Sequence, residues 1–287
     1  MRVGIVIGIL FVAVCIVILI MDSNRFHTVQ YGIRSEKVKE TFHFVFLSDL
    51  HNKTYGKQNE KLLAAIDAIR PDAVLIGGDI LTAKPGASLK PAISFVGSLA
   101  EKYKIYYANG NHEQRLIYYP EKYGSMAEDY EKALSEMGIR RLVNEGCSDT
   151  THGVRITGCE LSRYYYRRFE KTTLEPATLM EQMTKADTGE FQILLAHHPD
   201  YFEAYAAWGA DLILSGHVHG GVARIPFLGG VISPSCKLFP KYDGGIFHGK
   251  KATMIVSRGL GAHTIPFRFL NPAELVEVSI EPGKESS

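Results

Sequence analysis

The chain has 287 residues, of which 46% are hydrophobic and 22% are charged, an ordinary composition for a globular protein with a large core. Its 32 basic residues are balanced by 31 acidic ones, which leaves a formal net charge of +1. Proteins that bind phosphate backbones usually carry a basic excess, so this balance disfavours nucleic acid as a partner.

The first segment of the chain is apolar. Residues 3–21 carry no charge over nineteen positions, and a helix of that length rises about 28 Å, close to the roughly 30 Å of a hydrocarbon core. A cleavable signal peptide is the main alternative, but its apolar region is usually shorter and ends in small residues, whereas this one ends at Ile20-Met21-Asp22. We therefore expect a single-pass transmembrane anchor over residues 1–21, followed by a juxtamembrane segment, 22–41, with a possible first strand.

The charges on either side of the apolar run bear on its orientation. Arg2 precedes the run and Arg25, Arg34, Lys37 and Lys39 follow it, so a simple count favours a cytoplasmic C-terminal domain. Long domains, however, are translocated largely regardless of flanking charge, and a very short basic N-terminus often stays inside. We expect the domain on the extracytoplasmic face of the cell membrane.

Residues 42–287 alternate between strand-like and helix-like segments, as in an α/β domain. Short apolar runs predict strands near residues 44–47, 73–76, 105–108, 191–195 and 212–214. Apolar residues at helical spacing predict helices near 62–69 and 130–137. Residues 222–280 are rich in Gly, Pro and short β-like runs, which predicts a second sheet of mostly antiparallel strands. Two sheets flanked by helices are the expected outcome.

Polar side chains follow five of the predicted strands, at the point where each strand ends. In chain order they are Asp49 and His51, then Asp79, then Asn111 and His112, then His197, and finally His217 and His219. Open α/β sheets place their sites at the carboxyl ends of the strands, so these side chains are expected to converge.

The residue types and their spacing indicate metal binding. In the pairs Asp49/His51 and His217/His219 the residues are two positions apart, so an extended backbone would direct both side chains to one side. Carboxylate, imidazole and amide donors without thiolate suit divalent metals such as Mn, Fe, Zn or Co. Seven donors are too many for one tetrahedral ion, and Asp79 could bridge two ions about 3.5–4 Å apart, as in phosphoryl displacement.

The ordered motifs D-x-H, GGD, GNHE, H-x-P and GHVHGG resemble those of the calcineurin-like metallophosphoesterase superfamily, from about residue 42 to the C-terminus. The segments GGVARIPFLGG, FPKYDGGIF, VSRGLG, PFRF and NPAELV are similar to its membrane-associated bacterial phosphodiesterase branch. The resemblance implies a four-layer α/β/β/α sandwich with a dinuclear metal centre between the sheets, here preceded by one N-terminal transmembrane helix.

Carried over residue by residue, the resemblance implies seven metal ligands and one residue that contacts the scissile phosphate. Asp49, His51 and His219 would hold one metal, Asn111, His197 and His217 the other, Asp79 would bridge them, and His112 would contact the phosphate. In the H-x-P motif the adjacent His198 is the alternative to His197. The second motif lacks the further Asp and Arg of the protein Ser/Thr phosphatases, which argues against a phosphoprotein substrate.

Several other features have structural as well as functional interpretations. Glu113 either supports the metal site or starts a helix. Residues 163–169 (RYYYRRF) form either a rim for an anionic head group or an ordinary connecting loop. Residues 225–228 (IPFL) either touch lipid or fill the core. We expect structural roles for the remaining motif arginines and histidines: Arg258, Arg268, His27, His43, His152, His248 and His263.

The sequence thus predicts a membrane-anchored, metal-dependent hydrolase of a phosphodiester or phosphomonoester, acting by attack of a hydroxide that bridges two divalent metals. A tethered domain samples head groups at high effective concentration, so we expect a lipid or lipid-linked substrate. The alternatives are a non-catalytic, membrane-tethered binding protein on the same fold, and an exported nuclease or nucleotide phosphodiesterase.

Overall fold

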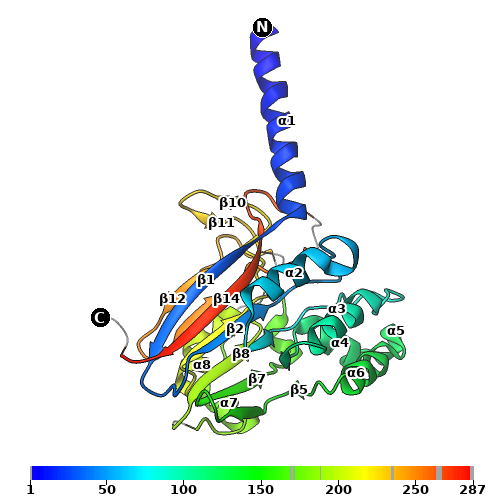
Figure 1. Cartoon of the computed structure of the whole chain (residues 1–287). Helices are drawn as coiled ribbons and strands as arrows, with labels where there is room; N and C mark the ends of the chain where they lie inside the picture. Colours follow the sequence, from blue (N-terminus) through cyan, green and yellow to red (C-terminus); the bar gives the residue numbers. More distant parts are fainter. Residues whose placement is uncertain are drawn as a thin grey trace.

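The structure, a computed structural model, describes residues 2–168, 170, 172–187, 189–233, 236–262 and 267–284 (Figure 1). Phe169, His263 and Pro266, which belong to segments considered above, lie outside these described residues. Helix α1 (Arg2–Asn24) projects from a domain built on two six-stranded sheets.

The first sheet has the strand order β1-β14-β2-β3-β4-β5. Its strands are β1 (Phe26–Ser35), β14 (Ala273–Pro282), β2 (Phe42–Leu47), β3 (Ala73–Ile76), β4 (Lys104–Ala108) and β5 (Arg141–Leu142). The last four are parallel to one another, whereas β14 is antiparallel to β2 and parallel to β1.

The second sheet has the strand order β12-β13-β9-β8-β7-β6. Its strands are β12 (Gly245–His248), β13 (Thr253–Val256), β9 (Leu212–Ser215), β8 (Phe191–Ala196), β7 (Val154–Cys159) and β6 (Gly146–Asp149). The four central strands are parallel and the two edge strands are antiparallel to their neighbours. A separate hairpin consists of β10 (Arg224–Ile225) and β11 (Gly229–Gly230).

Helices cover the outer face of each sheet. The first sheet is covered by α2 (Glu60–Ile69), α3 (Lys90–Ala100), α4 (Asn111–Tyr118), α5 (Pro120–Tyr123) and α6 (Met126–Glu136). The second is covered by α7 (Pro176–Gln182) and α8 (Phe202–Trp208). Three short 3-10 helices complete the described elements: η1 (Lys57–Asn59), η2 (Arg163–Tyr166) and η3 (Pro199–Tyr201).

Alternate side chains of the central strands enter different layers of the core. In β2, Val45 packs in the cluster shared with α2 and α3, whereas Phe44 packs in the cluster between the two sheets. In β8, Ile193 lies in that same inner cluster, whereas Leu194 packs in the cluster shared with α7 and α8. Because successive strand residues point to opposite faces, each apolar run is buried on both sides. The expected four-layer α/β/β/α sandwich is confirmed.

The expectation for residues 222–280 is wrong in its topology. Among the described residues of this region, β12 and β13 alone join the second sheet, where β13 is parallel to β9. β14 instead enters the first sheet, between β1 and β2. The pattern of apolar residues marks these segments as strands, but pairing between strands far apart in the chain is decided by packing, which that pattern does not encode.

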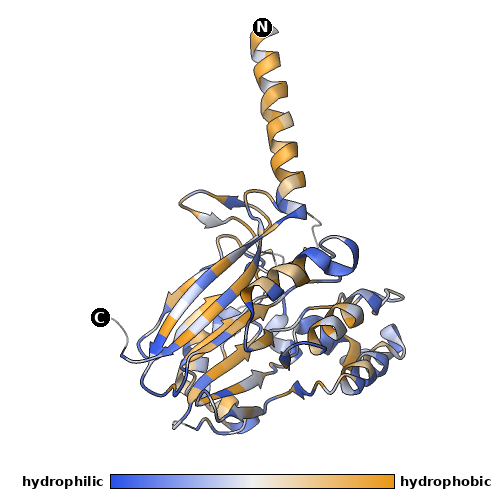
Figure 2. Cartoon of the chain, viewed as in Figure 1, coloured by the Kyte–Doolittle hydropathy of each residue, from blue (hydrophilic) through white to orange (hydrophobic). Residues whose placement is uncertain are grey.

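Helix α1 is long and apolar enough to cross a membrane: residues Val3–Asn24 form one candidate span, and its most apolar window has none of its residues buried in the protein (Figure 2). The helix ends against the domain. Asp22, which is 1% exposed, accepts a hydrogen bond from the backbone N–H of Asn271 at 3.1 Å. Ser23 Oγ accepts one from the backbone N–H of Arg268 at 3.0 Å. β1 follows at once and pairs with β14, so the segment 22–41 contains the edge strand of the first sheet, as expected for a possible first strand.

Candidate metal centre

The segments that follow β2, β3, β4, β8 and β9 carry all eight side chains predicted for the site, with Asn111 and His112 at the start of α4, and these segments meet at one edge of the sandwich. Six of these side chains line one small cavity of about 50 Å³: His51, Asp79, Asn111, His112, His217 and His219. The other two, Asp49 and His197, are buried beside it.

Asp49, His51 and His219 form one group of donors. The Nε2 atom of His219 lies 3.2 Å from Asp49 Oδ1 and 3.2 Å from His51 Nε2. All three side chains are buried, and their donor atoms lie close enough together to hold one metal ion. The structure therefore brings together the three residues expected to share one metal.

Asp79 lies between this group and His197. Its Oδ2 atom is 3.3 Å from His197 Nε2 and 3.7 Å from His51 Nε2. The carboxylate of Asp79 therefore faces one imidazole from each of the two expected metal positions. This is the position that a bridging carboxylate requires.

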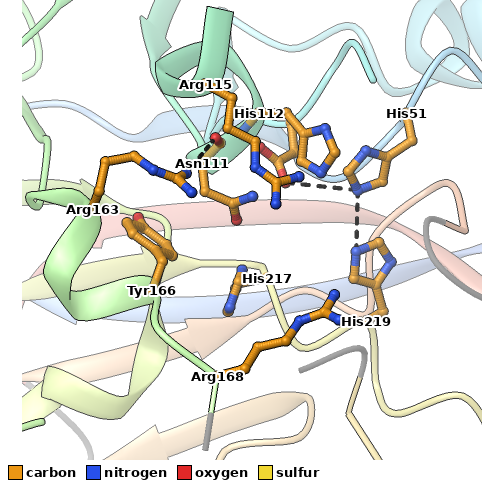
Figure 3. Close-up of a pocket in the computed structure, with 10 residues that line it drawn as sticks. His51, Asn111, His112, Arg115, Arg163, Tyr166, Arg168, His217 and His219 are labelled. Atoms are coloured by element: carbon orange, nitrogen blue, oxygen red, sulfur yellow. Dashed lines mark hydrogen bonds and ion pairs between the residues drawn. The ribbon is translucent and has the colours of Figure 1, made fainter. Parts of the chain in front are cut away.

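Asn111 and His217 complete the second group. In Figure 3 they lie on one side of the cavity, whereas His51 and His219 lie on the other. The ring centroid of His217 is 5.3 Å from that of His197. The Oδ1 atom of Asn111 is buried and has no hydrogen-bond partner among the described residues, which fits an oxygen that would bind a metal ion.

Backbone carbonyls orient two of the imidazoles. His197 Nδ1 lies 2.8 Å from Gly77 O, and His219 Nδ1 lies 3.2 Å from Gly261 O. A ring that donates through Nδ1 keeps Nε2 available as a metal ligand, an arrangement usual for metal-binding histidines. The ring of His198, the alternative to His197, lies 4.5 Å from that of His217, and its Nδ1 accepts from the backbone N–H of Asp200. His197 differs in that its Nε2 lies 3.3 Å from Asp79 Oδ2 and 3.7 Å from Asp49 Oδ1. The donor set therefore fits borderline divalent metals with His197 as the ligand.

The two carboxylates create a strong negative potential in the buried site. Burial alone would raise the pKa of Asp79, but the imidazoles of His197 and His112 outweigh it and hold the pKa well below its usual range. Burial alone would lower the pKa of His197, yet Asp79 and Asp49 raise it to about 10. These groups thus hold each other in charged forms, and a cation that binds at His197 must displace its proton.

The backbone of the site differs from the extended form assumed for the two ligand pairs. Five candidate ligands have left-handed backbone conformations: Asp49 (φ 55°), His51 (φ 50°), Asp79 (φ 56°), His217 (φ 68°) and His219 (φ 55°). Such conformations cost about 1 kcal/mol or more per residue and cluster at functional sites. The side chains converge because the loops turn tightly, so the extended-strand explanation of the spacing is wrong.

One glycine shows how closely these loops approach each other. Gly78 has φ 91°, and a Cβ atom there would lie 2.0 Å from the backbone nitrogen of Gly110. The loops after β3 and β4 therefore touch through their backbones. Any larger residue at Gly78 would push apart the loops that carry Asp79 and Asn111.

Glu113 links the same two loops through hydrogen bonds to their backbones. Its carboxylate accepts hydrogen bonds from the backbone N–H groups of Asp79 (2.8 Å), Ile80 (3.0 Å) and Gly110 (2.9 Å), and from the hydroxyl of Tyr107 (3.1 Å). Burial and the charge of Asp79 raise the pKa of Glu113 to about 7. Glu113 starts α4 and also supports the candidate ligands, so both interpretations of this residue hold.

Three guanidinium groups border the cavity, those of Arg115, Arg163 and Arg168. Arg163 and Arg168 belong to the segment 163–169 for which a rim was one interpretation. Arg115 was not foreseen, although it lies one helical turn after Asn111 on α4 and so on the same face. Tyr166 lies between these groups, with its ring 5.3 Å from that of His217. The described part of this segment therefore borders the site, and its cationic groups favour an anionic ligand.

Comparison with known proteins agrees with this geometry. The family described as calcineurin-like phosphoesterase matches residues 42–221. An uncharacterised metallophosphoesterase of Campylobacter jejuni is 27% identical over 254 residues, covering 86% of this chain and 61% of the relative. Phosphodiesterase YaeI of Escherichia coli is 25% identical over 224 residues, covering 77% of this chain and 76% of the relative.

A bovine transmembrane protein with a metallophosphoesterase domain is also similar, with 24% identity over 255 residues. The alignment covers 83% of this chain and 52% of the bovine protein. The chain thus spans about half to two thirds of the length of the bovine and Campylobacter relatives.

Replacing Asp79 by Asn tests the bridging position. Asp79→Asn keeps the shape of the side chain but removes the charge between the two groups, so the variant should bind at least one equivalent of divalent metal less than the wild type. Metal content after gel filtration, measured by mass spectrometry, checks this. The exposed Asp129→Asn on α6 is the matched control. Full metal content in Asp79→Asn would contradict the assignment.

Replacing Glu113 by Gln tests the support beneath the site. The amide would turn N–H groups toward backbone donors, so Glu113→Gln should lower the free energy of unfolding by about 3 kcal/mol. Equilibrium denaturation of the full chain in detergent measures this, with the exposed Glu121→Gln on α5 as control. A variant as stable as the wild type would show that the four hydrogen bonds matter little.

Proposed function

The chain belongs to the calcineurin-like phosphoesterase family, and from this premise we propose that it is a membrane-anchored, metal-dependent hydrolase of a lipid-linked phosphodiester or phosphomonoester. The observation that carries the proposal is the convergence of all seven expected donor side chains on one buried edge, beside three guanidinium groups. A binding protein that had lost catalysis would be under no constraint to keep this complete donor set together.

In this proposal Asp49, His51 and His219 hold one divalent metal and Asn111, His197 and His217 hold the other. The buried carboxylate of Asp79, which lies near His51 and His197, would contact both ions. Two bound ions would supply positive charge to the phosphoryl oxygens and activate water for attack on phosphorus. The described residues contribute the remaining functions, which are to bind the anion, orient it and supply a proton.

We propose that His112 acts on the substrate. Its Nδ1 atom accepts a hydrogen bond from the backbone N–H of Ala83 at 2.8 Å, so the neutral ring carries its proton on Nε2. The side chain lines the cavity, with its ring 4.7 Å from that of His51. From there Nε2–H can donate to a phosphoryl oxygen or to the leaving oxygen as negative charge develops.

A second cavity supports a substrate larger than inorganic phosphate. It has a volume of about 540 Å³ and shares Tyr166, Arg168 and His217 with the metal site. Lys237 and Tyr242 also line it. A phosphoester placed at the metals could therefore extend an esterified group into this space, where tyrosine rings and cations would contact it.

The membrane part of the proposal rests on α1. Its uncharged length suits a membrane span, and it joins the domain without a spacer. We propose the extracytoplasmic face for the domain, because long domains are translocated largely regardless of the charges that flank a span. A domain held at the bilayer meets head groups at high effective concentration, which favours a lipid-linked phosphoester.

Replacing His112 by Ala tests its role in turnover. If His112 acts on the transition state, His112→Ala should lower kcat by about 10²-fold or more while both metals stay bound. Steady-state kinetics on a chromogenic phosphodiester, together with metal content, measures both effects. Asn111→Ala is the comparison, since loss of a ligand should reduce metal content. An unchanged kcat, or equal metal loss in the two variants, would refute the role given to His112.

Placing the enzyme and a lipid-linked substrate in the same or in separate vesicles tests whether the substrate is lipid-linked. The full chain should cleave a lipid-linked phosphodiester about 10²-fold faster when enzyme and substrate share a vesicle than when they occupy separate vesicles. A soluble phosphodiester, including a nucleotide, should be cleaved at one rate in both arrangements. Equal rates on every lipid tested, with efficient cleavage of the soluble compound, would favour the soluble-nucleotide alternative.

A further inference from the structure

We infer that the domain makes a second contact with the bilayer, through an apolar surface beside the end of α1. This inference rests on the proposed membrane insertion of α1 and adds an interaction surface to it. The surface, which we call the apolar platform, consists of Ile225, Phe227, Leu228, Leu238, Phe239, Phe267 and Leu270. The partner is the acyl-chain and head-group boundary of a lipid bilayer.

The side chains of the apolar platform are exposed to an unusual degree. Phe227 is fully exposed at the tip of the β10–β11 hairpin, and Leu228 and Leu238 are 68% and 64% exposed. Of the fourteen large hydrophobic side chains exposed in the described residues outside α1, seven belong to this surface. Gathered apolar exposure of this kind marks a protein or membrane contact. The interpretation of residues 225–228 as core filling is therefore wrong.

Three residues of the apolar platform have strained backbone conformations. Phe227 (φ 69°), Phe239 (φ 45°) and Leu270 (φ 52°) all have left-handed conformations. Solvent-exposed turns with such angles normally use Gly, Asn or Asp, which adopt them with less strain and are polar or small. Bulky apolar residues at three such turns are unfavourable in water but useful where the turns point into lipid.

Hydrogen bonds connect the platform to the end of α1. The backbone N–H of Arg224 donates to Phe269 O at 3.0 Å, which joins the hairpin to the segment that contains Leu270. The same segment donates from Arg268 to Ser23 and from Asn271 to Asp22 in the last turn of α1. In Figures 1 and 2 the hairpin lies beside the domain end of the helix. A bilayer that contains α1 down to Met21 would therefore border this surface.

On the other side of the platform, the backbone N–H of Phe239 donates to Val231 O at 2.9 Å, next to β11. The loop that bears Leu238 and Phe239 is therefore attached directly to the hairpin. Backbone hydrogen bonds thus join the segments that carry the apolar side chains into one unit beside the end of α1.

Basic groups lie where lipid head groups would be. Arg25 is 54% exposed, and Lys53 Nζ donates to Asn24 Oδ1 at 2.9 Å, at the end of α1. Apolar side chains flanked by cations at this level are typical of interfacial contacts, which enter a bilayer by about 5–10 Å. The combination favours a lipid surface over a protein partner.

The contact would bring the second cavity close to the bilayer. Cys236, Lys237 and Pro240 line that cavity, and they flank Leu238 and Phe239 of the platform. A lipid-linked phosphoester could then pass from the bilayer along this loop to the metal site. The apolar platform thus gives a physical reason why a lipid-linked substrate would reach the site more easily than a soluble one.

Tryptophan placed on the platform tests the inference in the full chain. The fluorescence of Phe227→Trp should fall by about half in phosphatidylcholine–phosphatidylglycerol vesicles whose acyl chains carry bromine near the head groups. The reason is that an interfacial group lies about 5–10 Å deep. Trp208, the single native tryptophan, is buried in the domain, and its signal is subtracted by using the wild type. Met180→Trp on α7, exposed at the opposite end of the domain, is the matched control and should not be quenched.

A further variant separates this inference from the anchor itself. Phe11→Trp, within α1, should be quenched by bromines deeper in the chains. One outcome would overturn the apolar platform and leave the anchor in place. In that outcome the fluorescence of Phe11→Trp is quenched, but the fluorescence of Phe227→Trp is quenched no more than that of Met180→Trp. Absence of quenching in both would overturn the platform together with the membrane span.

A charged residue on the apolar platform tests whether contact of the platform with the membrane affects the rate of cleavage. Phe227→Asp should slow cleavage of the lipid-linked diester within a vesicle about fivefold or more, because charge opposes interfacial burial. Cleavage of a soluble diester should be unchanged, and Met180→Asp should affect neither rate. An equal loss on both substrates would contradict a role in membrane contact.

Discussion

The burial of two carboxylates among imidazoles, where the sheets of the sandwich meet, is the constraint on which the rest of the structure depends. Asp49 and Asp79 are almost fully buried, and such charges are stable only with close partners of opposite sign. The left-handed loops, the backbone contact at Gly78 and the hydrogen bonds of Glu113 all serve to hold those partners in place. Divalent cations in the same position would compensate the charge more completely than protons on histidine.

Much of this arrangement could be predicted because the relevant signals are local. β3 has the bounds foreseen from its apolar run, and the polar residues at the strand ends do converge. Three other features depend on contacts between distant parts of the chain. They are the place of β14 in the first sheet, the left-handed backbone of the ligands, and the position of Arg115 at the cavity. Only helical spacing from Asn111 offered a local indication of Arg115.

The end of helix α1 and the candidate metal centre share two supporting residues, Arg268 and Asn271. Arg268, which is buried, donates through its side chain to the carbonyls of Arg258 and Gly259, and through its backbone to Ser23 of α1. Asn271 links the same helix end to the carbonyl of His219 through a hydrogen bond of 2.8 Å. These hydrogen bonds therefore attach the end of α1 directly to the loops that carry the candidate ligands.

Anomalous diffraction at the metal absorption edge, from crystals of the full chain grown with the metal it retains, tests the central claim most directly. If the proposed centre is dinuclear, the density should show two ions, which in two-metal sites generally lie about 3.5–4 Å apart. One should contact Asp49, His51 and His219, and the other Asn111, His197 and His217, with Asp79 between them. A single ion, or an ion bound by His198 in place of His197, would contradict the dinuclear centre described above.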